Sequence, residues 1–385
     1  MNLTNNIYFS NFKVVRKDPK IKKLLLNLLI FKNEIINSLK KSYKYSYDKN
    51  IILKFKNIPT VILIGMGGSI LGAKSIYSFL KFKIKKKFIF IDNYSIKKKN
   101  TLKKNFVNLV ISKSGNTLET IVNSNIFVKK NHKNIFVTEN KKSYLRDFAY
   151  KLKAEIIDHN NHIGGRYSVL SEVGMLPAEL MGLNTSGFKK FEILVKNKHF
   201  MNSLIQNVSN TLNFLKKKKY NSIILNYDQS SNELFSWYQQ LIAESLGKQN
   251  KGFFPIISNL PEDNHSLMQY YLDGPKNNFY TFFYVEDHSS IKINDNLNTY
   301  FYLKNKKVND IKFAQFKATQ TIFKNKNIPF RSFIIKKKNE ESLGELFTFF
   351  ILETILLGQA MKINPYDQPA VELIKEETIK NMINS

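Results

Sequence analysis

The spacing of hydrophobic residues changes near residue 60. From Asn11 to Asn50, leucine and isoleucine recur every three or four positions among lysines, as in amphipathic helices. From Val61 onward, short unbroken apolar runs alternate with longer segments of helical spacing. We therefore expect residues 1–50 to form a helical arm that packs against an α/β core.

Unbroken apolar runs are typical of parallel strands that are covered on both faces by helices. Four such runs in the first half predict strands at 61–64, 88–92, 107–111 and 134–138. A second unit begins near Lys190 and opens with a similar strand, loop and helix. Its predicted elements are helices at 200–215, 233–246 and 345–357, and strands at 223–227, 279–285 and 328–335.

This order predicts two α/β domains in tandem, within residues 51–189 and 190–360, followed by a C-terminal arm over 361–385. The most apolar stretches, 24–31 and 344–358, are too short to cross a bilayer. The first residues also lack the pattern of a secretory signal. We expect a cytoplasmic protein without a membrane partner.

The formal net charge of +30 comes almost entirely from lysine, since the chain has only four arginines. Sites that read nucleic acid are usually rich in guanidinium groups, so the composition does not favour a specific nucleic-acid partner. The charge does favour anionic substrates. Cysteine is absent, which excludes disulfides and thiolate chemistry. Asp158, His159 and His162 do not form a convincing ligand set, so we expect neither a metal nor a cofactor.

Hydroxyl groups follow the predicted strand that ends at Ile111. The loop Ser112-Lys113-Ser114-Gly115-Asn116-Thr117 leads into a helix with Glu119 in its first turn. Hydroxyls, a lysine and the free N–H groups of a helix N-terminus together suit a phosphate monoester. These residues equally fit an ordinary polar loop in which Asn116 or Thr117 caps the helix.

A glycine-rich segment follows the first predicted strand, with Gly65, Gly67, Gly68 and Gly72. The dinucleotide fingerprint G-x-G-x-x-G would need glycine where Ile70 stands, although Asp92 lies near the expected ribose-binding position. We therefore favour a small ligand over a dinucleotide. The alternative is that these glycines only turn the chain into a helix.

Three further positions carry candidate chemistry. Arg166 follows Gly164-Gly165, and its planar charge cannot be imitated by lysine. Gln240 and Glu244 share a helix face, and Gly247 ends that helix, so Glu244 is a candidate general base. The alternative is an exposed Glu244 paired with Lys248.

The third position is His265, which follows the turn-forming residues Glu262, Asp263 and Asn264. An imidazole at the start of a helix could pass a proton to an oxygen. Simple capping of the turn by Asn264 is the alternative.

The motifs together resemble those of the glucose-6-phosphate isomerase family, from Val61 to Lys375. They are Gly67-Gly68-Ser69, Ser112–Thr120, Gly165–Val169, Glu244-Ser245-x-Gly247-Lys248, His265-Ser266 and Gln368-Pro369-x-Val371-Glu372-x-x-Lys375. The resemblance implies two sugar-isomerase (SIS) domains, each a mainly parallel sheet between helices. It also implies a homodimer with shared active sites. Leu246 departs from the family pattern, which usually has a polar residue there.

The resemblance also implies roles for individual residues. Glu244 would move a proton between C1 and C2, and Arg166 would stabilise the cis-enediolate. His265, contributed by the partner subunit, and Lys375 would open the sugar ring. The implied substrate-binding residues are Ser112, Lys113, Ser114 and Thr117 for the phosphate, and Gly68, Ser69, Gln240 and Gln368 for the sugar.

The expected activity is the reversible isomerisation of glucose 6-phosphate to fructose 6-phosphate, without a metal. One carboxylate can serve as both base and acid, because the proton moves between adjacent carbons on one face of the enediol. A guanidinium group can stabilise the oxyanion. Two alternatives remain: a dual phosphoglucose/phosphomannose isomerase, and a non-catalytic sugar-phosphate sensor. A nucleic-acid binder is suggested by charge alone.

Overall fold

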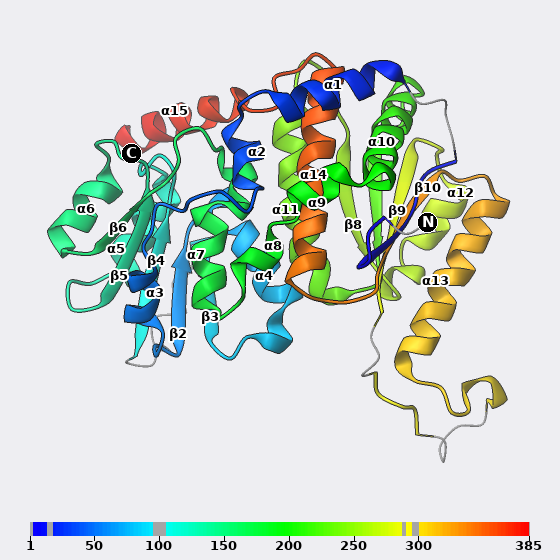
Figure 1. The fold of residues 1–385 in the computed structure, drawn as a ribbon, viewed down its shortest axis with the longest axis horizontal. Helices are drawn as coiled ribbons and strands as arrows, with labels where there is room; N and C mark the ends of the chain where they lie inside the picture. Colours follow the sequence, from blue (N-terminus) through cyan, green and yellow to red (C-terminus); the bar gives the residue numbers. More distant parts are fainter. Residues whose placement is uncertain (1–2, 14–17, 95–104, 287–289, 295–299, 385) are drawn as a thin grey trace.

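The computed structural model describes residues 3–13, 18–94, 105–286, 290–294 and 300–384 (Figure 1). Two five-stranded sheets lie at opposite sides of the molecule, with the long helix α14 (Glu340–Ala360) between them (Figure 1). Helix α11 (Asn232–Leu246) packs against α14 and against α4 (Leu71–Phe79), so it joins the two halves. The tandem α/β architecture is therefore confirmed.

The first sheet is parallel throughout, with strand order β3-β2-β4-β5-β6. Its strands are β2 (Thr60–Ile64), β3 (Lys87–Ile91), β4 (Phe106–Ile111), β5 (Lys133–Thr138) and β6 (Glu155–Asp158). The four predicted strands are confirmed. The prediction missed β6, which has only two apolar residues between two carboxylates.

The second sheet has the order β1-β10-β9-β7-β8. Its strands are β1 (Ile7–Ser10), β7 (Asn221–Asn226), β8 (Phe254–Asn259), β9 (Asn278–Val285) and β10 (Phe330–Ile335). All neighbours are parallel except β1, which runs antiparallel to β10 with Ile7 opposite Ile335. The first residues therefore extend this sheet, and the expectation of a wholly helical arm was wrong.

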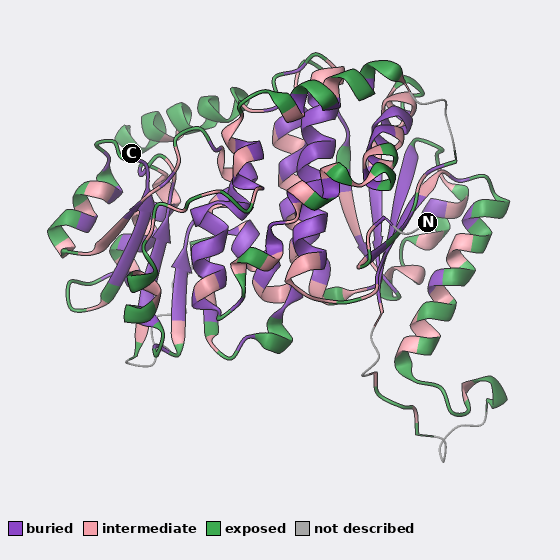
Figure 2. Cartoon of the chain, in the orientation of Figure 1, coloured by how far each residue is buried: buried purple, intermediate pink, exposed green. Residues whose placement is uncertain are grey.

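The described part of the arm beyond β1 contains the predicted helices only in part, as three short helices joined by turns. These are α1 (Pro19–Ile30), α2 (Glu34–Ser38) and α3 (Lys49–Phe55). In α1, Ile21, Leu25 and Leu28 are buried against α10 (Lys198–Lys216) and α14, while the lysines face solvent (Figure 2). Burial of this one stripe fixes α1 to the second domain, whereas α3 packs against α7 of the first domain.

The remaining helices cover the sheets or connect them. They are α5 (Leu118–Phe127), α6 (Tyr144–Leu152), α7 (Glu172–Leu180), α8 (Thr185–Phe188), α9 (Phe191–Lys196), α12 (Met268–Asp273), α13 (Val308–Asn325) and α15 (Ala370–Ile383). In α15 no residue is buried, and in Figure 2 the whole helix is drawn as exposed or intermediate.

Helix α14 extends beyond the predicted limits to 21 residues, from Glu340 to Ala360. Within the described part of the chain it is the one helix that is long and apolar enough to cross a membrane. The prediction that this stretch is too short to cross a bilayer was therefore wrong, because the predicted helix was shorter than the observed one. However, 89% of its apolar window is buried inside the protein. It is the central core helix, and it does not indicate a membrane protein (Figure 2).

Candidate functional site

The glycine-rich segment after β2 packs directly against the segment that carries Arg166. A Cβ atom added to Gly68 would lie 2.1 Å from the carbonyl carbon of Gly165 and 2.4 Å from the backbone nitrogen of Arg166. Gly67 has a φ of +49°, and an added Cβ would lie 2.6 Å from Nε2 of Gln240. Two of these glycines therefore permit close contact between parts of the chain. Asp92, the candidate ribose ligand, instead pairs with Lys74 at 2.8 Å.

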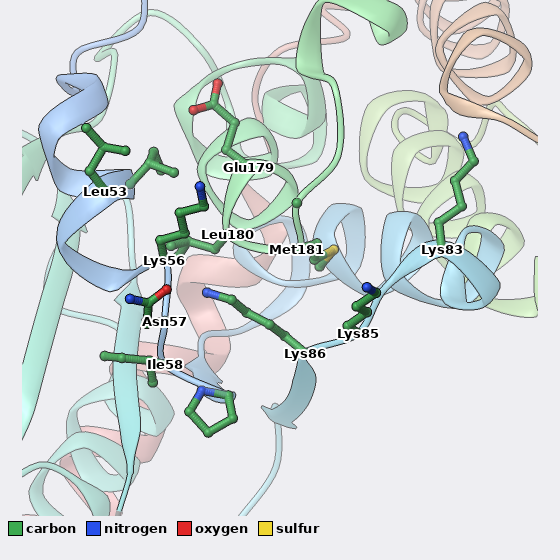
Figure 3. Close-up of a pocket in the computed structure, with 13 residues that line it drawn as sticks. Leu53, Lys56, Asn57, Ile58, Lys83, Lys85, Lys86, Glu179, Leu180 and Met181 are labelled. Carbon is green, nitrogen blue, oxygen red and sulfur yellow. The ribbon is translucent and has the colours of Figure 1, made fainter.

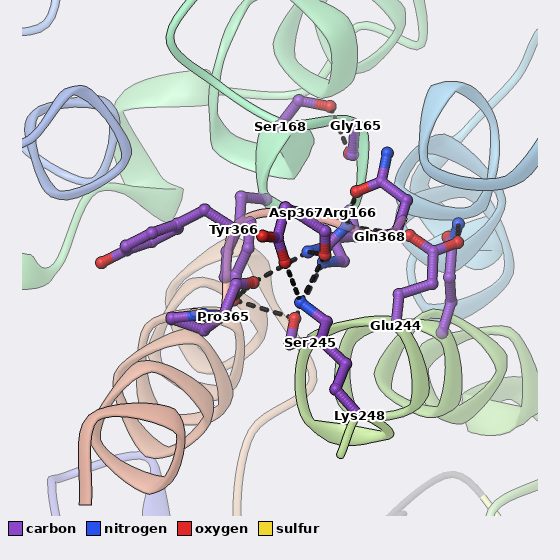
Figure 4. A network of polar contacts seen from close by, with 12 residues as sticks. Gly165, Arg166, Ser168, Glu244, Ser245, Lys248, Pro365, Tyr366, Asp367 and Gln368 are labelled. Carbon is purple, nitrogen blue, oxygen red and sulfur yellow. Dashed lines mark hydrogen bonds and ion pairs between the residues drawn. The ribbon is translucent and has the colours of Figure 1, made fainter. Parts of the chain in front are cut away.

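Arg166 is the centre of a network that joins both domains and the C-terminal segment (Figure 4). Its Nε donates to Ser245 Oγ at 2.8 Å, and its Nη1 donates to Glu244 Oε2 at 3.0 Å. Nη1 also donates to Gln368 Oε1 at 2.7 Å. The guanidinium is 2% exposed and its plane is held on several sides, so its orientation is fixed.

The backbone of the C-terminal segment completes this network. Nη2 of Arg166 donates to the carbonyl oxygens of Pro365 and Asp367 at 2.8 and 3.0 Å. Lys248 pairs with the side chain of Asp367, and this contact lowers the pKa of that carboxyl group. The alternative in which Lys248 pairs with Glu244 is therefore wrong, because the cationic partner of Glu244 is Arg166.

Glu244 lies in the last turn of α11, which ends at Gly247 as predicted. Both carboxylate oxygens are held: Oε2 by Arg166, and Oε1 by Nε2 of Gln240 at 2.7 Å. The Glu244 side chain is nevertheless 31% exposed. A fixed carboxylate that still reaches solvent, next to a buried guanidinium, can exchange a proton with a bound molecule and stabilise the resulting negative charge.

The phosphate-loop candidate lies between β4 and α5, at the edge of the sheet where η1 (Gly67–Ser69) follows β2. Neighbouring parallel strands bring their carboxyl ends to the same edge, where α/β proteins bind ligands. Ser112 Oγ and Thr117 Oγ1 lie 3.0 Å apart, and Thr117 makes no side-chain cap. The first-turn N–H groups of α5 therefore receive no capping bond from Thr117, the residue that begins the helix.

Lys113 and Ser114 complete this loop. Nζ of Lys113 donates to the carbonyl of Asn161 at 2.8 Å and lies 3.5 Å from Glu139. Ser114 is exposed, and its hydroxyl accepts from the backbone N–H of Asn116 at 3.2 Å. The loop thus has a half-buried cation and one exposed hydroxyl at the carboxyl edge of the sheet.

Two predicted catalytic residues are not brought into the Arg166 network within one chain. His265 is exposed in the turn after η6 (Glu262–Asn264), and α12 begins three residues later, at Met268. Lys375 lies on the exposed helix α15, where it pairs with Glu372 at 2.6 Å. Their predicted roles need a second chain or a movement of α15.

The network also contains residues that the sequence did not single out. Tyr167 donates to Pro365 at 3.0 Å and lies 2.9 Å from Ser245 Oγ, and burial raises its pKa to about 12. Ser245 occurs in a predicted motif, but its contact with Arg166 was not expected. Leu246, the departure from the family pattern, is buried in the hydrophobic core.

Comparison with known proteins identifies close relatives of the chain. A family model described as phosphoglucose isomerase matches residues 46–253. A glucose-6-phosphate isomerase of Methanocaldococcus jannaschii is 32% identical over 355 residues, covering 85% of each chain. One of Mycoplasmopsis synoviae is 32% identical, covering 83% of this chain and 81% of that protein.

Solved structures show the same fold. A hypothetical protein of Thermus thermophilus superposes with a TM-score of 0.78 at 22% identity, covering 96% of this chain and 99% of that chain. A glucose-6-phosphate isomerase of Chlamydia trachomatis superposes with a TM-score of 0.69 at 19% identity, covering 98% and 89%. Together with the matched family model and the 32% identical relatives, these findings show that the chain belongs to the phosphoglucose isomerase family, with two tandem SIS domains.

Proposed function

We propose that this chain interconverts glucose 6-phosphate and fructose 6-phosphate. The observation that carries the proposal is the pairing of buried Arg166 with partly exposed Glu244 at 3.0 Å. An aldose and a ketose differ by the position of one proton on adjacent carbons. One carboxylate can remove the proton from C2 and return it to C1 through a cis-enediol.

The arrangement of hydrogen bonds supports this division of roles. Gln240 and Arg166 hold Glu244 so that its carboxylate cannot rotate freely. The negative charge that forms on the enediolate oxygen would lie near Arg166, whose orientation is already fixed by five hydrogen bonds. Gln368, which accepts a hydrogen bond from Arg166, and Ser69, which follows Gly68 in η1, are proposed to bind the sugar together with Gln240 and the backbone at Gly68.

The phosphate group is proposed to bind the loop from Ser112 to Thr117. Hydroxyls of Ser112, Ser114 and Thr117, the first-turn N–H groups of α5 and the Lys113 ammonium would hold it. Binding energy from this unreactive end would position C2 against Glu244. Lys113 is thus proposed as part of the anchor and not as a catalyst.

A homodimer with shared active sites is the second part of the proposal. The exposed position of His265, outside the Arg166 network, supports its contribution by the partner subunit. Lys375 would join it in ring opening. We also propose a cytoplasmic location and the domain limits 51–189 and 190–360, between arms 1–50 and 361–385.

The substrate assignment is tested with purified protein in a coupled assay. Fructose 6-phosphate should yield glucose 6-phosphate, whereas mannose 6-phosphate should react far more slowly. Efficient turnover of both would establish the dual isomerase instead. Binding of fructose 6-phosphate without turnover of either would establish a sensor.

The shared site is tested by mixing two inactive variants, Glu244→Gln and His265→Ala. In a mixed dimer, one of the two sites combines an intact Glu244 with an intact His265 of the partner subunit. After subunit exchange, roughly a quarter of wild-type activity should return. No recovery in dimers shown to have exchanged would contradict the shared site.

A further inference from the structure

A cavity lies at the opposite edge of the first sheet from the proposed catalytic residues. It encloses about 690 Å³ and is formed around Pro59, just before β2, by α3, the end of α7 and the segment that leads into β3 (Figure 3). These are the amino ends of β2 and β3, whereas η1 and the phosphate loop follow the carboxyl ends of β2 and β4. The cavity is therefore separate from the proposed active site.

The cavity has an apolar wall large enough for the flat body of a ligand. Its apolar side chains are Ile52, Leu53, Ile58, Pro59, Leu180 and Met181. Leu53, which is 63% exposed, and Pro59, which is also exposed, present most of the apolar surface of this floor. Ile58, Leu180 and Met181 are at most 4% exposed and support it from behind. A purely inorganic anion would leave this apolar surface in contact with water.

Amines of Lys56, Lys85 and Lys86 border the same cavity (Figure 3). Lys56 and Lys85 form no ion pair with any residue in the described part of the chain. Lys86 is half-buried and donates to the carbonyl of Phe55 at 2.9 Å, and burial lowers its pKa. Three ammonium groups without a carboxylate partner attract an anion with several charges.

The other charged groups at the rim offset these three amines only in part, because a single glutamate lines the cavity together with them. Lys83 turns away from the cavity and pairs with Glu340 (Figure 3). Glu179 is the acidic residue among the lining groups, and its carboxylate accepts a hydrogen bond from Thr185 at 2.9 Å. Asn57 adds an amide that both donates and accepts, which is suited to the edge of a nucleobase.

We propose that this cavity binds a nucleoside polyphosphate, with the base on the apolar floor beside Asn57 and the phosphates on Lys56, Lys85 and Lys86. The volume lies within the range of about 300 to 1,000 Å³ typical of small-molecule sites. Lysine suits a polyphosphate because it acts as a mobile point charge. The site goes beyond the isomerase reaction and does not depend on it.

Calorimetric titration with ATP, in buffer containing EDTA to remove divalent cations, tests the proposal. ATP should bind with a stoichiometry of one per chain, and saturating fructose 6-phosphate should not displace it. The double variant Lys56→Gln, Lys85→Gln should weaken binding by roughly tenfold or more. The matched control, Lys22→Gln with Lys23→Gln on the exposed face of α1, loses the same charge away from the cavity and should bind ATP normally.

Four results would overturn the proposal. ATP could fail to bind, or fructose 6-phosphate could displace it, which would place it in the active site. Equal weakening in both double variants would show that only the net charge attracts it. Inorganic triphosphate binding as tightly as ATP would remove the nucleoside from the proposal.

Discussion

Two arginines are buried in the described part of the chain, and their carboxylate partners differ in how far they are exposed. The side chains of Arg166 and Arg331 are both 2% exposed, and each pairs with a glutamate. Glu353, the partner of Arg331, is 1% exposed, whereas Glu244, the partner of Arg166, is 31% exposed. Of these two pairs, only that of Arg166 leaves a charged group accessible to solvent.

Arg331 illustrates a closed network. It donates to Thr281 at 2.9 Å, Asn207 at 2.9 Å and Tyr238 at 3.2 Å, all of which are buried. Glu353 in turn accepts from Tyr238, and burial beside this carboxylate raises the pKa of the Tyr238 hydroxyl. Every charge is satisfied within the core, so the network joins β9, β10, α10, α11 and α14 without access to a ligand.

The comparison indicates how an ion pair that is open to a ligand differs from a closed structural one in this fold. Burial of the cation is common to both pairs and does not distinguish them. What distinguishes Arg166 is that its partners include a partly exposed carboxylate, an exposed amide of Gln368 and backbone carbonyls of a C-terminal segment. In such a pair the hydrogen bonds fix the guanidinium, while the carboxylate remains accessible to solvent.

The largest expected effect is that of Glu244→Gln, which keeps the size of the side chain but removes the base. We expect kcat to fall about a thousandfold or more, with fructose 6-phosphate affinity nearly unchanged. Coupled kinetics and calorimetry measure the two quantities. Glu233→Gln, in the first turn of the same helix, is the control and should retain activity. Near wild-type turnover in Glu244→Gln would remove this residue from its proposed role.

Arg331→Met should act on stability instead of chemistry. It leaves Glu353 as an unpaired buried charge, which lowers the free energy of unfolding by about 3–5 kcal/mol. Urea unfolding measures this loss, and kcat per folded molecule should remain close to wild type. Adding Glu353→Leu should recover much of the stability, because the unpaired charge is then gone. A large loss of kcat in the folded Arg331→Met protein would contradict the prediction that Arg331 acts only on stability.

Arg166→Lys keeps the positive charge but loses the planar group that makes five hydrogen bonds. We expect kcat to fall by about 10² to 10³, since one well-placed donor contributes this much in comparable sites. The assay is run far below the melting temperature, which is determined by calorimetry. Activity within a few fold of wild type would show that a point charge is sufficient.

Lys113→Gln should raise KM by roughly tenfold with a smaller change in kcat, because it removes one charge from the phosphate anchor. Lys141→Gln is a matched control: Lys141 contacts the same carboxylate, Glu139, at 3.3 Å, but its side chain is 66% exposed. A fall in kcat at unchanged KM would instead assign Lys113 to the chemical step.

The sequence predicts best what depends on neighbouring residues. Unbroken apolar runs predicted β2, β3, β4 and β5, and glycines before an arginine indicated Arg166. Strand β1 was missed because its partner β10 lies more than three hundred residues away, and no local pattern encodes that pairing. Strand β8 was missed because it contains Pro255, and a proline within an apolar run argues against a strand.

In the candidate site, too, contacts between residues far apart in the sequence could not be predicted. Arg166 and Glu244 lie in motifs. The backbone carbonyls of Pro365 and Asp367 hold Arg166, but every residue has such a carbonyl, so the sequence does not indicate these contacts. His265 and Lys375 match family motifs, yet the geometry of one chain does not bring them into the Arg166 network. Their positions depend on contacts that a single sequence does not encode.

The smallest expected effect concerns a third buried cation, Lys189, and it extends the comparison from arginine to lysine. Nζ of Lys189 donates to the carbonyl oxygens of Ser38 and Leu170, and it lies 5.1 Å from the ring centres of Tyr43 and Tyr45. Burial lowers its pKa to about 7, although the nearby carboxylates of Glu172 and Glu192 oppose that shift. Unlike the two arginines, this group can lose its proton near neutral pH.

In the unfolded chain this lysine keeps its proton up to about pH 10.4. Between pH 7 and that value the unfolded state binds more protons, so the free energy of unfolding should rise with pH. The Lys189 contribution between pH 7 and 8 should be about 1 kcal/mol. Burial raises the pKa of Tyr43 and Tyr45, which keeps both rings neutral over this interval.

Urea unfolding of wild type and Lys189→Met at pH 6, 7, 8 and 9 separates this contribution from that of groups away from Lys189, which titrate alike in both proteins. The stability of wild type relative to the variant should increase from pH 7 to pH 9. A difference that does not change with pH would show that Lys189 keeps its proton in the folded state. The carbonyls of Ser38 and Leu170 and the two aromatic rings would then stabilise a buried ammonium as firmly as Glu353 stabilises Arg331.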